Sequence, residues 1–435
     1  MEKSSLNNLN IRKQLLSIYQ NALDAVNGRK VVVNFFQKYS QTTPLALLAI
    51  GKAATQMAAG AFDIFGAQIT HALIITKSGH LDKTLLPNYP ITCLETAHPV
   101  PDESSLAAGQ TLLDFIQNLP PQSPVLVLIS GGASALVEVL VSGVTLADLQ
   151  RVNAWLLASE LDIHAMNRIR KSLSAIKGGR LAAYLKEHPV LNLLISDVPG
   201  DDLQAIGSGL LTPHSSTSLL SKERTHLETP FSRSPKGPKK EFTLPTWLQV
   251  LLAKAHPLAI STDFSNIKQH LIATPALARQ AAAQNLQNAH YTVFNSETFI
   301  QGDAEAAGRT LAQQLKHAVP GFYIWSSETT VFLPEKPGQG GRCQHLALAA
   351  ACELAAQKEV MLLAAGTDGN DGPGQVAGAL VDGKTLARGK QKGFDAEQCL
   401  EKADAGRFLA ASDDLIVTGP TGTNVMDILI AHVSR

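Results

Sequence analysis

Cysteine is scarce in this chain, and net charge is absent. The four cysteines, Cys93, Cys343, Cys352 and Cys399, lie far apart without the spacing of metal ligands, so we expect free thiols in a reducing compartment. Basic and acidic residues balance at 37 each, so no overall field favours nucleic acid or an acidic membrane as a partner. This composition is typical of an enzyme that acts on small molecules.

Long hydrophobic runs are also missing. No apolar stretch approaches the ~18 residues that cross a bilayer, and residues 1–8 contain no apolar signal core. We therefore expect a cytoplasmic protein with no membrane partner. At 435 residues the chain is longer than one hydrophobic core usually grows, which favours two domains.

One segment, residues 221–241, is polar and punctuated by proline and glycine, which is typical of a linker or surface loop. Its short basic run, with Lys236, Lys239 and Lys240, is interpreted as a solvated loop rather than a nucleic-acid patch. We place the domain boundary just beyond it, which gives domains at residues 1–256 and 257–435.

Short apolar runs alternate with longer helical patterns, which predicts an α/β fold around a mostly parallel sheet. Helices are predicted at residues 9–26, 52–64, 104–118, 145–161, 173–185, 275–288 and 303–317. Strands are predicted at residues 45–50, 73–76, 91–95, 125–129, 190–195, 291–294, 322–325 and 360–365. A hairpin is expected to join 322–325 to a further strand at 330–333.

The glycine-rich stretch at residues 337–346 is the strongest local signal. Gly338, Gly340 and Gly341 would leave backbone N–H groups open to converge on an anion, and Arg342 follows where a helix should begin. The guanidinium has the forked donor geometry that suits phosphate oxygens. Cys343 stands where the dinucleotide fingerprint requires its last glycine, which weakens a nicotinamide-binding interpretation.

Similar polar turns follow four predicted strands, where ligands bind in open α/β sheets. Lys52 could reach a transferring phosphate, and the Ser130–Ser134 turn, with Gly131, Gly132 and the hydroxyl of Ser134, offers a second cradle. Asp197 and Asp368 could hold Mg²⁺ or accept the proton of an attacking hydroxyl. Helix capping or an Asx-turn is the structural alternative for both aspartates. Together the turns indicate phosphoryl transfer.

A third basic cluster occupies residues 164–180. Arg168, Lys171 and Lys177 are spaced to lie along one helical face, where a substrate carboxylate or phosphate could bind. A solvated helix face is the alternative.

Two other motifs match, in whole or in part, the sequence pattern of a known site but lack the context that the pattern requires. Residues 378–385 match the P-loop pattern, but the polar, glycine-rich residues before them are not the buried strand that a P-loop follows. Ser134 is placed like a hydrolase nucleophile, but Leu136 replaces the glycine that such an elbow needs.

The chain resembles the class II glycerate kinases over nearly its whole length. The motifs that carry the resemblance are Gly51-Lys52-Ala53-Ala54, Ser130-Gly131-Gly132, residues 170–182, Ser196-Asp197-Val198, Gly340-Gly341-Arg342, Gly366-Thr367-Asp368-Gly369 and residues 418–425. The resemblance implies ATP-dependent, Mg²⁺-requiring phosphorylation of D-glycerate at its 2-hydroxyl, giving 2-phosphoglycerate. It also implies a Rossmann-like N-terminal domain, a smaller C-terminal α/β domain and an active site in the cleft between them.

Carried over to this sequence, the family's catalytic lysine and arginine are Lys52 and Arg342, with Asp197 as a further catalytic residue. The resemblance adds Thr423 and Asn424 to the expected nucleotide and substrate contacts, which also include Lys177 of the basic cluster. The family's acidic strand ends are Asp197 and Asp368, which are the expected Mg²⁺ ligands. A homodimer stays open as an alternative to a single chain.

The sequence departs from the family pattern at several positions. Cys343 and His345 replace an asparagine and a glutamate beside the arginine, Ser326-Ser327 replaces a glycine pair, and Ala133 interrupts a triple glycine. Leu210-Leu211 replaces a Pro-Thr pair. Two alternatives to a kinase therefore remain open. One is a hydroxypyruvate reductase-type oxidoreductase, although the incomplete glycine fingerprint argues against it. The other is a relative that binds ligand without turnover.

Overall fold

Unbroken runs of branched apolar residues form the buried central strands of a first sheet. In the computed structural model the strand order is β3 (Thr92–Thr96), β2 (Ile69–Lys77), β1 (Leu45–Ile50), β4 (Val125–Ile129), β5 (Val190–Ile195) and β6 (Ile267–Ala273). The pairs from β3 to β5 are parallel. This is the order of a doubly wound α/β sheet. The structure describes residues 2–37, 45–88, 91–159, 161, 163–212, 244–255, 263–357 and 359–434.

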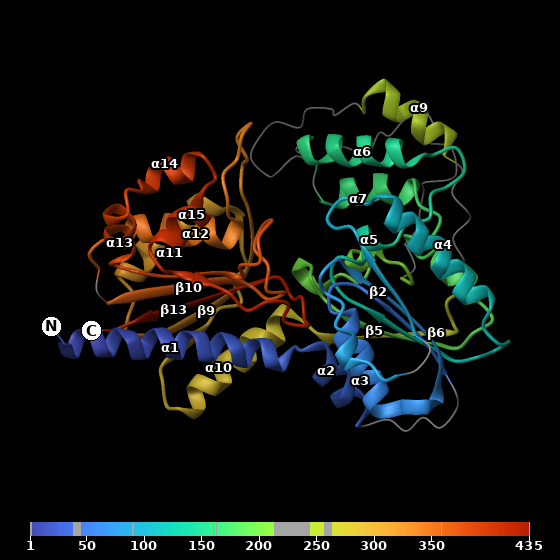
Figure 1. Cartoon of the computed structure of the whole chain (residues 1–435), viewed down its shortest axis with the longest axis horizontal. Helices are drawn as coiled ribbons and strands as arrows, with labels where there is room; N and C mark the ends of the chain where they lie inside the picture. Colours follow the sequence, from blue (N-terminus) through green and yellow to red (C-terminus); the bar gives the residue numbers. More distant parts are fainter. Residues whose placement is uncertain are drawn as a thin grey trace. The chain divides into compact units, whose positions relative to one another are not determined.

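Helices cover both faces of the first sheet. α3 (Ala54–Phe65) packs against β1 and β2, while α4 (Glu103–Gln117) and the short α5 (Ala133–Leu136) contact β2 from the other face (Figure 1). The remaining helices of this region are α2 (Gly28–Phe36), α6 (Leu146–Ala158), α7 (Ile163–Ser172), α8 (Leu181–Tyr184) and α9 (Thr246–Lys254). Apolar residues of α6, α7 and α9 form a separate core cluster that includes Leu149, Val152, Ile169 and Leu248.

A second, mixed sheet has the order β12 (Leu415–Ile416), β11 (Gly378–Asp382), β10 (Val360–Gly366), β13 (Asp427–Val433), β9 (Gly321–Thr330) and β7 (Val293–Asn295), with β8 (Ile300–Asp303) also paired to β9. One face carries α11 (Ala304–Lys316) and α12 (Arg342–Glu353), and the other carries α1 (Glu2–Ala25) and α10 (Pro275–Asn288) (Figure 1). The short helices α13 (Thr385–Gln391), α14 (Ala396–Glu401) and α15 (Ala405–Ala411) complete this region.

The chain divides into two compact units that differ from the expected domains. Unit 1 comprises Met1–Val31, Ile195–Pro199 and Ala273–Arg435, and unit 2 comprises Val32–Leu194 and Gly200–Ile272. The first helix belongs to unit 1 because its apolar side chains, including Leu15, Ile18 and Ala22, are buried where α1 covers the second sheet. The predicted loop at residues 221–241 and the boundary at 256–257 lie outside the described residues.

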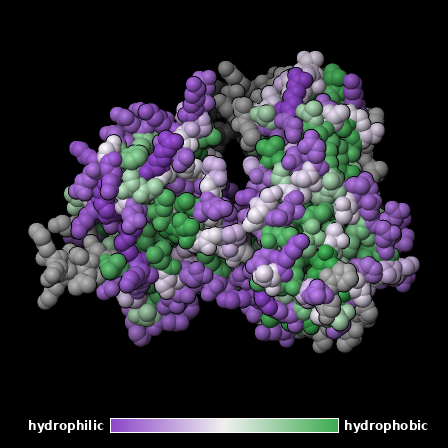
Figure 2. All heavy atoms as spheres, viewed as in Figure 1, coloured by the Kyte–Doolittle hydropathy of each residue, from purple (hydrophilic) through white to green (hydrophobic). Residues whose placement is uncertain are grey.

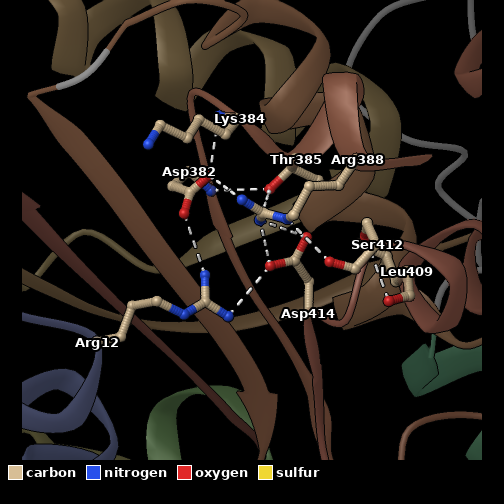
Figure 3. A network of polar contacts seen from close by, with 8 residues as sticks. All are labelled: Arg12, Asp382, Lys384, Thr385, Arg388, Leu409, Ser412 and Asp414. Carbon is tan, nitrogen blue, oxygen red and sulfur yellow. Dashed lines mark hydrogen bonds and ion pairs between the residues drawn. The ribbon is translucent and has the colours of Figure 1, made fainter. Parts of the chain in front are cut away.

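A polar network also ties α1 to unit 1 (Figure 3). Arg12 Nη1 lies 3.3 Å from Asp382 Oδ2, and its Nη2 lies 3.1 Å from Asp414 Oδ1. Arg388 binds the same two carboxylates, with Nη2 2.6 Å from Asp414 Oδ1. Two guanidinium groups therefore balance two carboxylates, of which Asp414 is fully buried.

Two predicted elements are wrong. Residues 173–185 are not one helix, because Gly178 and Gly179 take φ values of +64° and +84°, and only Leu181–Tyr184 is helical there. The expected hairpin is absent among the described residues, since β9 continues as one strand through Ser326 and Ser327 to Thr330. Beyond it, Phe332 and Leu333 are 83% and 68% exposed.

Hydrophilic and hydrophobic residues are interspersed on the face drawn in Figure 2. Among the described residues no helix is long and apolar enough to cross a membrane.

Candidate active site

Unit 2 has a group of candidate site residues at the reversal point of its sheet. From β1 the chain winds outward to β2 and β3, and it then returns to place β4 on the other side of β1. Ligands of open α/β sheets bind outside the carboxyl ends of the strands at such a point. The turns after β1 and β4 are Gly51-Lys52 and Ser130-Gly131-Gly132, as the sequence predicted.

These two turns are bonded to each other. Lys52 N donates to Gly131 O at 2.9 Å, and Ala53 N donates to Ser130 Oγ at 3.0 Å. Gly51 is required by this close approach, because a Cβ there would lie 2.1 Å from Ser130 Oγ and its φ is +133°. The structure therefore brings Lys52 together with Ser130, Gly131 and Gly132.

The serines of this cradle already have protein partners. Ser130 is fully buried and accepts from Ala53, while Ser134 Oγ lies 2.6 Å from Ser208 Oγ. Gly132 is the N-cap residue of α5, with a φ of +86°. A ligand at this cradle would therefore contact the backbone around Gly132 more directly than the serine hydroxyl groups.

Two histidines near the cradle were not predicted from the sequence. A Cβ on Gly132 would lie 3.2 Å from His98 Cδ2, and His80 Nδ1 lies 3.3 Å from Lys52 O. Each follows a strand of the first sheet, His80 after β2 and His98 after β3. That placement is the signal by which they could have been found.

Lys177 has a carboxylate partner. Its ammonium forms a buried ion pair with Glu138, and the two side chains are 3% and 1% exposed. The expected ligand contact of Lys177 therefore competes with a protein contact, since removing one member of a buried pair is costly.

Unit 1 has its own group of candidate site residues, around the start of α12. Asp371 accepts hydrogen bonds from Cys343 N at 3.0 Å and from Gln344 N at 2.7 Å. It thereby caps N–H groups in the first turn of α12. Burial, reinforced by the charge of Asp427, raises the pKa of Asp371 to about 6.

The glycines before α12 permit close packing. A Cβ on Gly338 would lie 2.3 Å from side-chain atoms of Asp404, and one on Gly341 would lie 2.3 Å from Asp371 Oδ1. Gly340 has a φ of +130°. Within the described residues, N–H groups of Gly340 and Gly341 have no hydrogen-bond partner, so these two stay available to an anion.

Arg342 is held by two carboxylates that sequence reasoning did not place in the site. Its Nε lies 2.6 Å from Asp427 Oδ2 and its Nη2 lies 3.1 Å from Asp427 Oδ1, a bidentate pair. Its Nη1 donates to Glu328 Oε1 at 2.9 Å. Burial alone would lower the pKa of Arg342, but these contacts raise it. The sequence signal for these carboxylates was Arg342 itself, because a guanidinium beside a buried strand end needs carboxylate partners.

Loss of solvent raises the pKa of Glu328 to about 7, although Arg342 opposes the shift. Asp427 and Asp197 reinforce it. Glu328 therefore changes charge close to neutral pH, next to the guanidinium.

The loop after β10 and the turn before β13 are joined by Thr367. Its hydroxyl donates to Met426 O at 2.6 Å and accepts from Val425 N at 2.8 Å. Tyr19 of α1 fixes the start of this loop by donating to Gly366 O at 2.6 Å. The loop carries Asp368, whose Oδ1 accepts from Asn370 N at 2.9 Å in an Asx-turn.

Asn424 and Thr423 lie on the joined turn. Asn424 Nδ2 lies 3.5 Å from Asp197 Oδ2, so the structure brings these two expected site residues together. Thr423 is 1% exposed, and its hydroxyl oxygen has no hydrogen-bond partner in the part of the chain that the structure describes.

The carboxylates of Asp368 and Asp427 converge. Their Oδ1 atoms lie 3.4 and 3.5 Å from the position of a Cβ built on Gly366. No group of three His, Cys, Asp or Glu side chains in the described part of the chain is arranged to hold a metal. Mg²⁺ that is carried by a nucleotide needs only one or two carboxylates, so Asp197 and Asp368 fit that role chemically.

The predicted site residues fall into two sets. Unit 2 holds Lys52, Ser130, Gly131, Gly132, Ser134 and Lys177. Unit 1 holds Asp197, Gly338, Gly340, Gly341, Arg342, Asp368, Thr423 and Asn424.

The P-loop-like residues 378–385 are not a phosphate loop. Gly378–Asp382 is β11, which pairs with β10, and Lys384 precedes α13. The backbone of Lys384 donates to Asp382 Oδ1, while its side chain points away from the network in Figure 3.

Comparisons with known proteins agree with the motifs. A family model described as a domain of unknown function (DUF4147) matches residues 14–226, and the MOFRL family model matches residues 321–427. A D-glycerate 2-kinase of Thermotoga maritima is 35% identical over 97% of this chain and 98% of its own. A glycerate 2-kinase of Pyrococcus horikoshii is 32% identical over 96% and 93%. The crystal structure of a glycerate kinase from Thermotoga maritima, 32% identical, superposes with a TM-score of 0.78 and covers 98% of this chain and 100% of that one.

Proposed function

Because the chain belongs to the glycerate kinase family, we propose that it transfers the γ-phosphoryl group of ATP to the 2-hydroxyl of D-glycerate, giving 2-phosphoglycerate and ADP. The observation that carries the proposal is the bonded pair of turns at the reversal point of the first sheet, with Lys52 beside the Ser130–Gly132 cradle.

In the proposed reaction, the 2-hydroxyl oxygen attacks the γ-phosphorus while the bond to the β,γ-bridging oxygen breaks. Such a transfer needs positioning and positive charge more than covalent help. We assign this positive charge to the side chains of Lys52 and Arg342. The hydroxyl proton passes to a carboxylate of the unit 1 set, in which Asp197 lies beside Asn424.

Mg²⁺ that enters with ATP would supply further positive charge on the phosphates. Asp197 and Asp368 would hold it, because both offer hard carboxylate oxygens near strand ends. Asp427 keeps the fork of Arg342 oriented rather than contacting the metal, since both of its oxygens face the guanidinium.

The test is ADP release from purified protein with Mg²⁺-ATP and D-glycerate, followed by phosphorus NMR. We expect a 2-phosphoglycerate signal that is absent with L-glycerate or without protein. Formation of 3-phosphoglycerate alone, or no phosphorylated product, would contradict the proposal.

A parallel assay separates the kinase from a reductase. Oxidation of NADH with hydroxypyruvate as the acceptor should stay at background, because the glycine stretch lacks the full dinucleotide fingerprint. Steady NADH oxidation would favour the oxidoreductase instead. ATP binding without turnover of either substrate would favour a relative that binds without catalysing.

A further inference from the structure

The end of α1 and the start of α2 hold two turns that carry expected site residues. α1 packs against β10 and β13, and the turns lie at residues 366–372 after β10 and at residues 417–426 before β13. The first turn carries Asp368, and the second carries Thr423 and Asn424. Residues 1–31 and both turns belong to unit 1, but the proposed transfer gives the N-terminal residues no role.

The first turn is anchored by Tyr19. This side chain is 2% exposed, and its hydroxyl donates to Gly366 O at 2.6 Å. Gly369 N donates to the same oxygen at 3.4 Å, so this carbonyl closes the tight turn that contains Asp368. The hydrogen bond from Tyr19 therefore fixes the acceptor on which the turn is built.

The second turn is anchored by the residues that link α1 to α2. Asn27 Nδ2 donates to Thr421 O at 3.3 Å, and Gly28 N donates to Gly422 O at 2.9 Å. Gly422 has a φ of +76°, a conformation that other residues rarely adopt. These two consecutive carbonyl groups directly precede Thr423, so the N-terminal residues fix the backbone that presents it.

The two turns are also bonded to each other. Thr421 Oγ1 donates to Thr367 O, and Val425 N donates to Thr367 Oγ1 at 2.8 Å. Asn27 has a second task, because its Oδ1 accepts from Arg29 N at 3.1 Å at the start of α2. Residues 19–28 thus hold a pair of joined turns from one side.

We propose that Tyr19 and Asn27 are positioning residues that hold both turns in the conformation that binds the nucleotide. The inference rests on the proposed function, in which ATP and its Mg²⁺ bind at these turns. A loop that must be ordered on binding lowers affinity, because only the fraction of molecules in the competent conformation binds ligand. Anchors that do not touch the ligand remove this cost before the ligand arrives.

The first test is hydrogen–deuterium exchange of the ligand-free protein, read by mass spectrometry. Tyr19→Phe removes only the hydroxyl, so amides of residues 366–372 should exchange about 3- to 10-fold faster, the size of one neutral hydrogen bond. Tyr323→Phe is the matched control, because Tyr323 of unit 1 also donates to a carbonyl, Val319 O at 2.7 Å, outside both turns. Unchanged exchange of both turns in folded Tyr19→Phe would overturn the proposal.

A second variant tests the other anchor. Asn27→Asp keeps an oxygen that can cap α2 but removes the Nδ2 donor, and it turns a carboxylate toward the carbonyl of Thr421. Exchange should therefore increase in residues 417–426 while the amides of α2 keep their rates. Faster exchange in α2 alone would reduce Asn27 to a helix cap and overturn its part of the proposal.

The functional consequence is measured as ATP affinity, by equilibrium dialysis in the presence of Mg²⁺. Tyr19→Phe and Asn27→Asp should each weaken ATP binding about 3- to 10-fold, and Tyr323→Phe should leave it unchanged. In steady-state kinetics, KM for ATP should rise more than KM for D-glycerate. Equal ATP affinity in the unsubstituted protein and in both anchor variants would overturn the role in binding.

These measurements also separate the anchors from the proposed reaction. If the unsubstituted protein binds ATP but forms no product, the proposed transfer is contradicted, whereas weaker ATP binding to Tyr19→Phe still supports the anchors. If the unsubstituted protein does not bind ATP, both are overturned. Unfolding temperatures distinguish a lost anchor from general destabilisation, because Tyr19→Phe and Tyr323→Phe each lose one tyrosine-to-carbonyl hydrogen bond.

Discussion

The two units treat their buried cations in opposite ways. In unit 1, Arg342 is surrounded by carboxylates, with Asp427 on two of its nitrogens and Glu328 on a third. In unit 2, Lys171 Nζ donates to the carbonyl of Gln204, and Lys177 forms a buried ion pair with Glu138. Unit 1 therefore places two carboxylates on one cation, whereas unit 2 gives Lys177 one carboxylate and Lys171 a neutral carbonyl.

The difference shows what each region can still bind. A guanidinium held by two carboxylates is fixed in orientation, and the surplus carboxylates suit a divalent cation. The Lys177–Glu138 pair carries no net charge, so it has no surplus carboxylate for a metal. The number of carboxylates on each cation thus distinguishes the two units.

The largest expected effect comes from removing the principal cation of each unit. Lys52→Met and Arg342→Met should each lower kcat by about 10²- to 10³-fold or more, because each removes charge aimed at the transferring phosphoryl group. The measurement is ADP release at saturating substrates. If Lys52→Met keeps normal turnover, the role of the reversal point in catalysis is wrong.

The next effect tests whether Asp427 orients Arg342. Asp427→Asn keeps the size of the side chain but removes the charge of the bidentate pair, so we expect kcat to fall about 10- to 100-fold. KM for both substrates should change less. Glu335→Gln, on an exposed residue of unit 1, is the control. A change in KM alone would assign Asp427 to substrate binding rather than to positioning.

A smaller effect is a pH-dependent stability difference at Asp371. Because its pKa is raised to about 6 in the folded protein, the folded state binds this proton more tightly than the unfolded state. The contribution of Asp371 to the free energy of unfolding is therefore fully present below about pH 4 and is lost as the pH rises through about 6. The free energy of unfolding lost in Asp371→Asn should accordingly decrease between pH 4 and pH 7. Denaturant titrations of both proteins at several pH values measure it, and a constant difference would contradict the shift.

The smallest effect is expected at the P-loop-like sequence. Lys384→Ala should leave kcat unchanged and alter the free energy of unfolding by no more than about 0.5 kcal/mol, because the network uses the backbone of Lys384 and not its side chain. Activity lost only in Lys384→Ala would overturn the assignment of both cation sites.

Much of the fold could be predicted because its signals are local. The strands at Leu45–Ile50, Val125–Ile129 and Val190–Ile195 match their predicted bounds, since continuous apolar runs between polar turns have few alternatives. α10 (Pro275–Asn288) also matches, because Thr274 caps it and proline begins it.

The failures depend on information that is not local. Helix α7 (Ile163–Ser172) was not among the predicted helices, although its basic residues were spaced as on one helical face, because its apolar face is narrow, with Ala165 and Ile169 buried. The assignment of α1 to unit 1 depends on packing against strands more than 300 residues later in the chain. Asp427 was missed for the same reason, because only the pairing of β13 with β9 brings it near Glu328.

The position of α1 also has a consequence for synthesis of the protein. Arg12 and Tyr19 find their partners 370 and 347 residues later, and the sheet that covers the apolar face of α1 is completed by β13 near the end of the chain. At about 5–20 residues per second, a ribosome needs roughly 20–75 s to supply those partners. Before α10 and then the second sheet are made, Leu15, Ile18 and Ala22 lack their native packing surfaces, so the first helix made is buried late and the nascent chain would need protection from aggregation.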